Sequence, residues 1–362
     1  MRPLKKIAIL PGDGIGIEVT REARQLLELY RNHAKLPLEL WDLDFGAERY
    51  LRDGTTLPPD VLDQIRRGCD AVLLGALGDP RVKSNDHARD ILFGIRFGCD
   101  LYANIRPVRA LSDRLVPIKD KRAADVDFVV FRENTEGLYA NIGGYLRKGT
   151  PGEVAIDEDI NTRQGVERII VAAFEFARAT KRTRVHMADK SNALRHSHEL
   201  WLRAFHEIRG RYPEIEGVHM YVDALCLRII QAPEEFQVIV TNNLFGDIVT
   251  DLAAALQGGL GMAASANVFS SDLSRVAMFE PVHGSAPLLV GKDLANPFAA
   301  FSTVGMMLAH LGWPTEEERI ESAIRRALES GNCTTDVGGR LGTRAAGAWV
   351  RDEVKRLLQA AD

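Results

Sequence analysis

Two aspartates in the segment Thr241-Asn-Asn-Leu-Phe-Gly-Asp-Ile-Val-Thr-Asp251 have the spacing that points most directly to chemistry. The segment places Asp247 and Asp251 one helical turn apart, behind a glycine turn. Carboxylates at this spacing repel each other, and their apolar neighbours argue against open water. A cation between them would relieve the repulsion, and oxygen-only ligands suit Mg²⁺ or Mn²⁺ rather than zinc. Taken alone, the pair is more typical of a solvated acidic helix face, so the metal interpretation depends on residues elsewhere.

Three arginines, Arg96, Arg106 and Arg132, lie beside apolar or turn-forming residues. The planar guanidinium group suits bidentate binding of carboxylates. Each arginine alone is typical of a surface position or an ion pair. Three of them around one pocket would describe a site for a dicarboxylic acid.

Two further candidates, Tyr139 and Lys190, are expected at the ends of strands or in loops, where catalytic groups of α/β proteins are often found. A nearby metal ion would lower the pKa of either side chain. In isolation, both are more typical of packing or surface residues. The sequence contains no Gly-x-Ser-x-Gly or Walker A motif, which argues against the usual hydrolases and kinases.

The glycine-rich segment 11–16, Pro-Gly-Asp-Gly-Ile-Gly, resembles a dinucleotide-binding turn, but its spacing is GxGxG rather than GxGxxG. A convincing acidic residue about 20 positions further on is also missing. The segment is therefore either a simple tight turn or a turn whose glycines let the backbone approach a ligand closely.

The elements that must position these residues alternate between strands and helices. The expected strands are 6–10, 71–74, 126–131, 184–187 and 237–241, and the expected helices are 17–30, 61–68, 165–179 and most of 315–359. Alternation of this kind predicts an α/β fold with helices on both faces of a sheet. No internal repeat or flexible linker is visible, so any two domains should be interleaved.

Composition is that of an ordinary globular enzyme. The 362 residues suggest about two domains, and 46% hydrophobic with 27% charged residues fits a folded protein. A net charge of −4 gives no sign of a nucleic-acid or membrane surface. The four cysteines lack CxxC spacing, and the sequence has neither a secretory signal nor an apolar run long enough to span a membrane. We therefore expect a cytoplasmic protein with reduced thiols.

Six motifs in order make the chain resemble the metal-dependent β-decarboxylating dehydrogenases, which act on isopropylmalate, isocitrate, homoisocitrate, tartrate or D-malate. The motifs span nearly the whole chain and are Leu10-Pro-Gly-Asp-Gly-Ile-Gly, Asp100-Leu-Tyr-Ala-Asn-Ile-Arg-Pro, Arg132-Glu-Asn-Thr-Glu-Gly-Leu-Tyr, Asp189-Lys-Ser-Asn, Asn243-Leu-Phe-Gly-Asp-Ile-Val-Thr-Asp and Phe279-Glu-Pro-Val-His-Gly-Ser-Ala-Pro. The resemblance implies two interleaved α/β domains that are not a true Rossmann fold. Residues 1–103 plus 258–362 would bind the dinucleotide, and residues 104–257 would carry the dimer interface and the metal and substrate residues.

The resemblance also implies a role for each candidate residue. Asp247 and Asp251 would hold Mg²⁺ or Mn²⁺ together with Asp223 from a second subunit. Lys190, also supplied by the second subunit, would be the general base, and Tyr139 would protonate the enol carbon. Arg96, Arg106 and Arg132 would bind the carboxylates of the malate core. Because the active sites would be shared, we expect a homodimer, with a higher oligomer left open.

For the cofactor, the resemblance favours NAD and leaves NADP as an alternative. The expected contacts are the loop Gly12, Asp13 and Gly14, the loop His283, Gly284, Ser285, Ala286 and Pro287, and Asn296 near the adenine. The chain departs from the family at Leu288 and Leu289, where NAD-dependent members usually carry an acid and NADP-dependent isocitrate enzymes carry Lys and Tyr. Asp293 is an alternative acceptor for the ribose hydroxyls.

The substituent on C3 of the malate core should be recognised by the segment 86–93. Leu92, with Ile91 and Phe93, would form an apolar wall suited to an isopropyl group. We therefore expect oxidative decarboxylation of 3-isopropylmalate to 4-methyl-2-oxopentanoate, a step of leucine biosynthesis. Arg89 and the Glu-Asn-Thr-Glu-Gly motif keep homoisocitrate and isocitrate open, followed by tartrate and D-malate. A non-catalytic binding homologue would show gaps in the catalytic set, and the sequence shows none.

Overall fold

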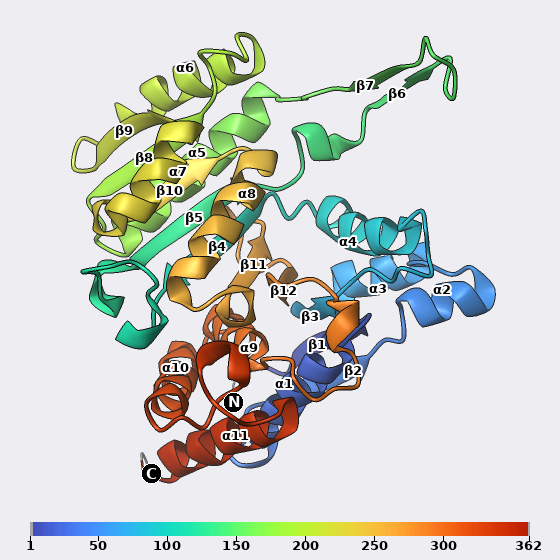
Figure 1. The fold of residues 1–362 in the computed structure, drawn as a ribbon, viewed down its shortest axis with the longest axis vertical. Helices are drawn as coiled ribbons and strands as arrows, with labels where there is room; N and C mark the ends of the chain where they lie inside the picture. Colours follow the sequence, from blue (N-terminus) through green and yellow to red (C-terminus); the bar gives the residue numbers. More distant parts are fainter. Residues whose placement is uncertain (1–2, 361–362) are drawn as a thin grey trace. The chain divides into compact units, whose positions relative to one another are not determined.

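The computed structural model describes residues 3–360 and divides the chain into two compact units (Figure 1). Unit 1 contains Met1–Leu101, Arg109–Ala124 and Ala254–Asp362, and unit 2 contains Tyr102–Val108 and Asp125–Ala253. Both units combine mainly parallel strands with helices, so the predicted α/β class is confirmed. The predicted central domain, 104–257, includes the segment Arg109–Ala124, which clusters with unit 1 instead.

Unit 1 contains five strands in the order β2-β1-β3-β12-β11. They are β2 (Leu38–Asp42), β1 (Lys5–Gly12), β3 (Ala71–Ala76), β12 (Ala277–Pro281) and β11 (Ala264–Val268). β1 is parallel to both β2 and β3, β3 is parallel to β12, and β11 is antiparallel to β12. β3 is buried along its whole length, as expected for a parallel strand with helices on both faces.

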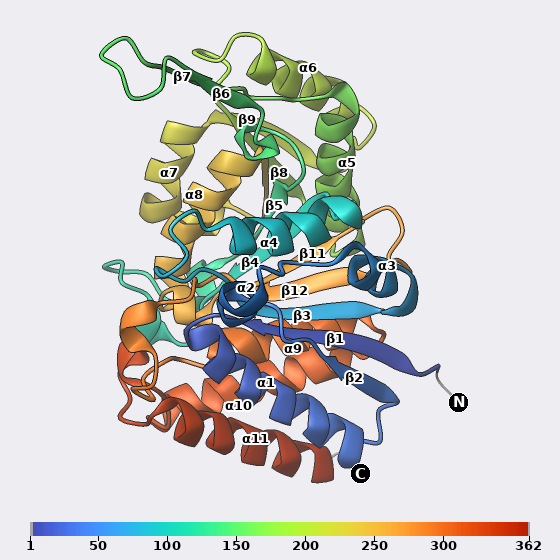
Figure 2. The same cartoon turned by 90° about the vertical axis from the view of Figure 1, so that its right-hand side faces the viewer.

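Helices cover both faces of these strands (Figure 2). One face carries α1 (Ile15–Asn32), α9 (Phe298–His310), α10 (Pro314–Glu329) and α11 (Thr343–Gln359). The other face carries α2 (Ala47–Asp53), α3 (Pro59–Gly68) and α4 (Asp86–Gly98).

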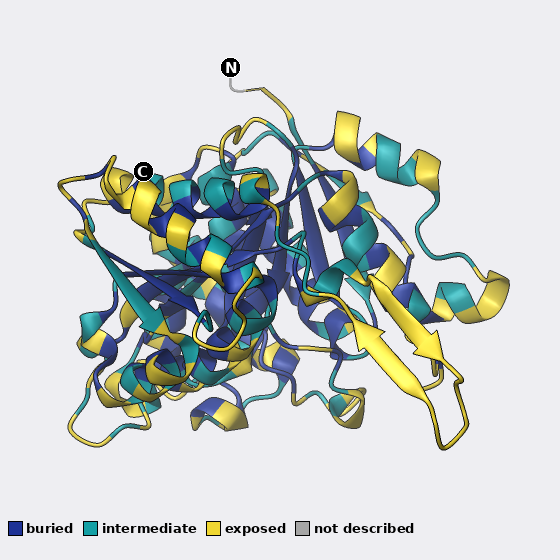
Figure 3. Ribbon diagram, turned by 90° about the horizontal axis from the view of Figure 1, so that it is seen from above, coloured by how far each residue is buried: buried dark blue, intermediate teal, exposed yellow. Residues whose placement is uncertain are grey.

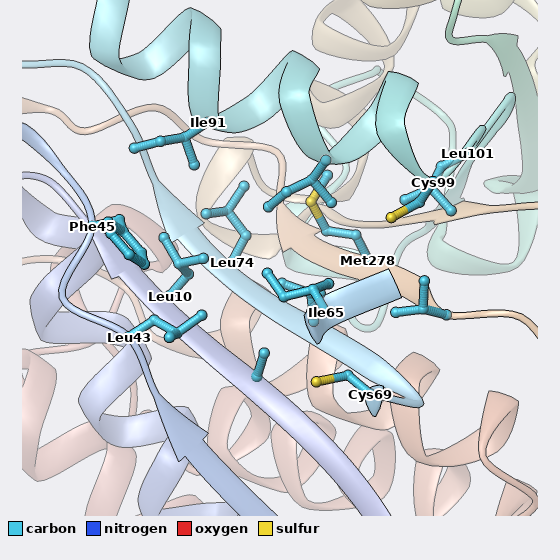
Figure 4. Close-up of a cluster of buried hydrophobic side chains, with 14 residues drawn as sticks. Leu10, Leu43, Phe45, Ile65, Cys69, Leu74, Ile91, Cys99, Leu101 and Met278 are labelled. Carbon is cyan, nitrogen blue, oxygen red and sulfur yellow. The ribbon is translucent and has the colours of Figure 1, made fainter. Parts of the chain in front are cut away.

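A cluster of buried side chains fixes α3 and α4 to the strands of unit 1 (Figure 4). Leu10 and Leu74 come from β1 and β3, while Ile65 belongs to α3 and Ile91 to α4. Burial of one such side chain contributes about 1.5–3 kcal/mol relative to an exposed one. Because Ile91 is fully buried, the cluster holds the first half of α4 in place.

The main strands of unit 2 follow the order β4-β5-β10-β8-β9. They are β4 (Ala103–Arg109), β5 (Asp127–Glu133), β10 (Val238–Thr241), β8 (Arg184–Asp189) and β9 (Glu216–Tyr221). The pairs β5–β10, β10–β8 and β8–β9 are parallel.

The helices of unit 2 pack on its strands from two sides (Figure 2). α5 (Arg163–Ala179) and α6 (Ser197–Arg209) lie on one side, and α7 (Val222–Gln231) and α8 (Asn243–Ala254) lie on the other. The helices follow the carboxyl ends of parallel strands, so residues just after a strand or in the first turns of a helix gather at one edge. Lys190 directly follows β8, Asp223 lies in the first turn of α7 and Asp247 lies near the start of α8.

A hairpin of β6 (Gly143–Leu146) and β7 (Val154–Asp157) extends from unit 2 (Figure 3). The two strands are antiparallel, and all eight of their residues are exposed. Three of the exposed side chains, Tyr145, Leu146 and Ile156, are large and apolar.

Short 3₁₀ helices lie in the connections, at Asp113–Leu115, Ala123–Asp125, Leu138–Ala140, Pro233–Glu235, Ala255–Gln257, Leu260–Met262, Pro287–Leu289 and Thr335–Val337. Among the residues that the structure describes, no helix combines the length and the apolar character needed to cross a membrane.

Two turn predictions differ from the structure. β1 continues to Gly12 and α1 begins at Ile15, so the turn predicted over 11–16 is confined to the residues between them. Gly246 was expected in a turn before the aspartates but lies inside α8. A glycine within a helix usually marks a close approach of another group rather than a turn.

Candidate active site

The first turn of α8 is fixed by Asn242, which directly follows β10. Its side-chain oxygen accepts a hydrogen bond from the backbone N–H of Phe245 at 2.9 Å, which caps the helix. The register that follows places Asn243, Asp247, Thr250 and Asp251 on one face of α8, because residues three and four apart are neighbours on a helix.

Arg132, the sixth residue of β5, lies against α8 because position 246 is glycine. A Cβ atom on Gly246 would lie 2.5 Å from Cγ of Arg132, a distance that real side chains do not tolerate. The Arg132 guanidinium donates from Nε and Nη2 to Oδ1 of Asn243, at 3.0 and 2.8 Å, and from Nη1 to Asp247. Arg132 is 2% exposed, so this charge is held in a fixed position at the Asp247 carboxylate.

A second buried arginine, Arg106 of β4, reaches the same carboxylate. It donates from Nη2 to Oδ1 of Asp247 at 3.2 Å and from Nη1 to Thr250 Oγ1 at 2.6 Å, while its Nε donates to Asn104. Its Nη1 is 3.9 Å from Oδ1 of Asp251. Two of the three predicted arginines therefore meet at the predicted metal-binding helix.

The phenol of Tyr139 completes this group of residues. Its hydroxyl donates to Oδ2 of Asp247 at 3.0 Å, and the guanidinium of Arg132 lies 5.3 Å from the centre of its ring. Burial and the negative charge of Asp247 raise the pKa of Tyr139 above its usual range. The hydroxyl therefore keeps its proton at neutral pH, as a proton donor must.

Asp251 carries a negative charge that its surroundings do not fully balance. Burial and the neighbouring carboxylate of Asp247 raise its pKa, and the opposing effects of Arg106 and Arg132 are smaller. An added cation would remove this repulsion, and an oxygen-only donor pair suits Mg²⁺ or Mn²⁺. The residues therefore fit a divalent ion, although no group of three His, Cys, Asp or Glu side chains able to hold a metal occurs within residues 3–360 of one chain.

Lys190 and Asp223 form a separate pair in unit 2. Nζ of Lys190 donates to Oδ1 of Asp223 at 2.6 Å, and this contact lowers the pKa of the carboxyl. The backbone N–H of Lys190 donates to Nδ1 of His198 at 2.9 Å, which fixes the chain just after β8. The Asp223 side chain is 67% exposed.

In unit 1, the two predicted nucleotide loops touch each other. The backbone N–H of Ile15 donates to the carbonyl of Ser285 at 2.9 Å. Gly14 has a φ of 59°, and a Cβ there would lie 2.1 Å from the same carbonyl oxygen. Glycine is therefore required at position 14 by both the backbone conformation and the close approach of the second loop.

The Asp13 carboxylate is directed into unit 1. It accepts hydrogen bonds from the N–H groups of Ala47 and Gly78, at 2.6 and 2.7 Å, and lies 2.8 Å from Nε2 of His87. With 3% exposure, Asp13 holds the loop in shape through these three contacts. His87 was not singled out from the sequence.

The loop 283–287 begins with a buried histidine. Nδ1 of His283 lies 3.1 Å from the carbonyl oxygen of Gly284, and burial lowers the pKa of the imidazole, so the ring is neutral. Gly284, Ala286 and Pro287 follow in the same loop, and Leu288 just after them is 83% exposed.

Asn296 and Asp293 both have protein partners. Asn296 donates to Oδ2 of Asp336 at 3.0 Å. Asp293, the alternative ribose acceptor, accepts hydrogen bonds from the backbone N–H and from Nε of Arg344, at 3.1 and 3.2 Å.

The remaining predicted substrate residues, Arg96 and Leu92, lie on α4 in unit 1. Arg96 is buried, donates from Nη2 to Oε1 of Glu280 at 2.7 Å, and has no hydrogen-bond partner for Nε among the described residues. Leu92 is partly buried against the hydrophobic cluster of Figure 4. Arg96 thus belongs to a different unit from Arg106 and Arg132.

Some residues of these groups were missed in the sequence. Asn243 and Thr250 could have been found, since they lie four residues before and three residues after Asp247 on the same helix face. Glu280, which binds Arg96, is 184 positions away from it, and no local pattern reveals such a pair.

Comparisons with known proteins give a consistent result. A model of the isocitrate/isopropylmalate dehydrogenase family matches residues 6–353. The 3-isopropylmalate dehydrogenase of Streptomyces griseus is 42% identical over 94% of this chain and 98% of that protein, and that of Thermobifida fusca is 41% identical with the same coverage.

Solved structures agree with the sequence relatives. The isocitrate dehydrogenase of Methylococcus capsulatus is 35% identical, with a TM-score of 0.87 over 97% of this chain and 100% of that one. A β-decarboxylating dehydrogenase of Thermococcus kodakarensis is 32% identical, with a TM-score of 0.78 over 98% of each chain. The resemblance seen in the sequence is therefore confirmed, and the chain belongs to the isocitrate/isopropylmalate dehydrogenase family.

Proposed function

We propose that the protein catalyses the oxidative decarboxylation of 3-isopropylmalate to 4-methyl-2-oxopentanoate, with NAD as oxidant and Mg²⁺ or Mn²⁺ as metal. The observation that carries the proposal is the meeting of two buried arginines and a protonated tyrosine at one carboxylate of the acidic pair on α8. Relatives at 41% to 43% identity that bear the name 3-isopropylmalate dehydrogenase support this choice of substrate.

In the proposed reaction, the side chains of this chain bind the acid and move two protons. Arg106 and Arg132 bind substrate carboxylates, and Lys190 accepts the proton of the C2 hydroxyl. When bound, the dinucleotide takes up the hydride from C2 and the divalent ion stabilises the negative charge on the C2 oxygen. The bond from C3 to its carboxyl group then breaks, CO₂ leaves, and Tyr139 donates its proton to C3.

The metal would be held by Asp247 and Asp251 of one chain and Asp223 of another. Asp251 supports this assignment because partial burial and repulsion from Asp247, one helical turn away, together raise its pKa, and a bound cation would relieve that repulsion. Asp223 supports it in a different way, since its carboxylate is mostly exposed and available to a second copy of the chain.

The C3 substituent is proposed to contact Leu92 and Phe93 of α4. The alternative of a tricarboxylate substrate needs a free cation, and Arg89 was the candidate. In the structure, Arg89 is paired with Asp86 at 3.1 Å and Asp90 at 3.3 Å on the exposed side of α4. This pairing supports isopropylmalate ahead of homoisocitrate and isocitrate, with tartrate and D-malate after them.

NAD remains our choice of cofactor, bound by unit 1 at the loops 12–14 and 283–287 and at Asn296. Asp293 is engaged by Arg344, so it offers less support as a ribose acceptor than the sequence alone suggests. The exposed Leu288 offers a 2′-phosphate neither attraction nor repulsion. NADP is therefore the alternative to be tested alongside NAD.

We also propose that the protein acts as a homodimer with shared active sites. The hairpin β6–β7 supports this, because Tyr145, Leu146 and Ile156 expose apolar surface on short strands whose edges are unpaired within the described chain. The exposed carboxylate of Asp223, paired with the partly exposed Lys190, gives a second reason. Assembly beyond the dimer and the cytoplasmic location expected from the sequence remain predictions.

The proposal is tested by the initial rate of NADH or NADPH formation with Mn²⁺ present. The substrates to compare at equal concentration are 3-isopropylmalate, homoisocitrate, isocitrate, D-malate and tartrate. We expect a clear preference for 3-isopropylmalate with NAD. A preference for another acid would replace the proposed substrate, and no turnover of any of them would favour a non-catalytic binding protein.

A further inference from the structure

His87 is a buried residue of unit 1 that the proposed chemistry does not use. It is the second residue of α4, is fully buried, and has its Nε2 2.8 Å from Oδ2 of Asp13. A carboxylate only accepts hydrogen bonds, so Nε2 must carry the proton and donate it. Nδ1 then has no hydrogen-bond partner among the described residues. A buried ring nitrogen without a hydrogen-bond partner costs free energy, and an apolar side chain would avoid that penalty. The hydrogen bond to Asp13 is therefore what favours a histidine at position 87.

Asp13 connects His87 to the predicted nucleotide loops. Its carboxylate also accepts the N–H groups of Ala47 and Gly78, which fixes the turn between β1 and α1. Two residues later, the N–H of Ile15 donates to the carbonyl of Ser285 in the second loop. A change in the position of either loop is therefore transmitted to the first turn of α4 through Asp13 and His87.

The other end of α4 has a connection of the same kind. Arg96 donates to Oε1 of Glu280 at 2.7 Å, and Asn267 donates to the same oxygen at 2.9 Å. Glu280 lies on β12, three residues before His283 begins the second loop. Both ends of α4 are thus bonded to segments that lead into a predicted nucleotide loop.

Between these two ends, α4 carries Leu92 and Phe93, which are proposed to contact the C3 substituent. The helix spans Asp86–Gly98 and is held to the strands by Ile91 and Ile95. A short helix packed in this way moves as a unit, because hydrogen bonds between successive turns hold its backbone together. The position of α4 that is compatible with a bound dinucleotide therefore also determines where Leu92 and Phe93 lie.

We propose that α4 couples dinucleotide binding to recognition of the C3 substituent, and that His87 is the positioning residue that links the helix to the Asp13 loop. The proposal rests on the proposed function, since it needs a dinucleotide at the two loops and a substituted malate at α4. Each ligand favours the same position of α4, so each tightens the binding of the other by the same factor.

The coupling can be measured without turnover. NADH is titrated by its fluorescence in the presence of Mn²⁺, with and without saturating 3-isopropylmalate, because the reduced cofactor cannot oxidise the acid. We expect 3-isopropylmalate to tighten NADH binding about fivefold or more in the unaltered protein. In His87→Leu this factor should fall close to one. His87→Gln, whose amide can still donate to Asp13, should recover most of it.

His186 provides a matched control in unit 2. It is also buried, also has an Nδ1 without a hydrogen-bond partner, and packs against the Phe236 ring at 4.7 Å. His186→Leu should leave the coupling factor unchanged. If His87→Leu does not fold, Asp13→Asn tests the same contact, because it replaces one acceptor oxygen facing His87 by a donor. This variant should also reduce the coupling factor to about one.

A second readout separates positioning from general damage. The ratio of kcat/KM for 3-isopropylmalate to that for D-malate should fall several-fold in His87→Leu and remain constant in His186→Leu. Full coupling in folded His87→Leu, or an equal loss in His186→Leu, would overturn the inference. Absence of NADH binding in the unaltered protein would instead refute the proposed function, and binding without any effect of the acid would refute only the coupling.

Discussion

Subunit complementation tests the shared active site most directly. Lys190→Met removes the proposed base from the Lys190–Asp223 pair, and Asp247→Asn removes the carboxylate that Arg106, Arg132 and Tyr139 contact. Each homodimer should be nearly inactive. A dimer of one chain of each kind should contain one site with both changes and one site with neither.

The expected recovery follows from this arrangement. Random exchange between equal amounts of the two variants makes half of the dimers mixed, and each mixed dimer has one intact site out of two. Activity should therefore rise to roughly a quarter of that of the unaltered protein. Mixed dimers isolated with two different affinity tags should show about half of the unaltered activity per dimer.

The control is a mixture of Lys190→Met with Asp223→Asn. These two side chains are 2.6 Å apart in one chain, so they enter the same site together and no mixed dimer has an intact site. We expect no recovery from this mixture. The assay is the rate of NADH formation with 3-isopropylmalate and Mn²⁺ after subunit exchange.

The reasoning is refuted if the mixture of Lys190→Met and Asp247→Asn stays inactive although mixed dimers have formed. Such a result would mean that each chain builds its own complete site. The Lys190–Asp223 pair would then be a surface ion pair, which is the ordinary interpretation of an exposed contact of this kind.

Three other predictions concern single residues. Asp251→Asn should raise the Mn²⁺ concentration for half-maximal rate by about tenfold or more, because affinity depends on the number of charged ligands, and an unchanged requirement would remove Asp251 from the metal site. Burial lowers the pKa of His186 from 6.5 to about 4, so the folded protein loses about 3 kcal/mol as the pH falls from 6.5 to 4 while the unfolded chain takes up the proton. In urea unfolding, His186→Phe should lack this part of the acid sensitivity, and a parallel pH profile would contradict the argument. Burial raises the pKa of Glu317 from 4.5 to about 7, so its effect on stability has the opposite sign. The stabilisation present below pH 4.5 is lost as the pH rises through 7, and the loss reaches about 3 kcal/mol at pH 8. Glu317→Gln should abolish this loss of stability.

The regular β-turn-α units could be predicted because their periodicity is strong. The strand expected over 6–10 and the helix expected over 17–30 correspond to β1 and α1, with ends extended by one to two residues. β3 was expected to end at residue 74 but runs to Ala76. Its last two residues include Gly75, where a Cβ would lie 2.2 Å from the carbonyl oxygen of Pro11. This close approach requires a glycine at position 75. Because glycine is uncommon within strands, the sequence pattern placed the end of the strand just before it.

The hairpin β6–β7 could not be predicted by the same means. Each strand has four residues, and all eight are exposed, so neither shows the alternation of a half-buried strand. The connection 147–153 contains two glycines and a proline and is typical of a loop. If a second chain covers the hairpin, its strands are stabilised by contacts with that chain, and these contacts leave no pattern in the local sequence.

The candidate site of unit 2 was partly visible in the sequence. Spacing alone places Asp247 and Asp251 on one face of a helix, and the structure shows them there. The meeting of Arg106 and Arg132 at Asp247 depends on three separate strands and helices, so the sequence supported it only as a hypothesis. The roles of these residues in catalysis remain predictions.

Four aspartates assigned to the proposed cofactor and metal sites have the same side chain and differ in what surrounds them. Asp13 is held by two backbone N–H groups and one imidazole, which leaves its carboxylate little capacity for an outside ligand. Asp223 faces one ammonium group at the surface, and Asp247 faces two guanidinium groups and a phenol.

Asp251 differs from the other three because partial burial and repulsion from Asp247 raise its pKa, while the guanidinium of Arg106 is 3.9 Å away. A divalent ion gains most at a carboxylate that a like charge repels and no close cation neutralises, because the ion then displaces no existing partner. At Asp247, by contrast, an incoming ion competes with Arg106 and Arg132 for the same oxygen. In the proposed reaction these arginines would turn toward the substrate carboxylates when metal and acid bind together, so we expect each ligand to bind more weakly without the other.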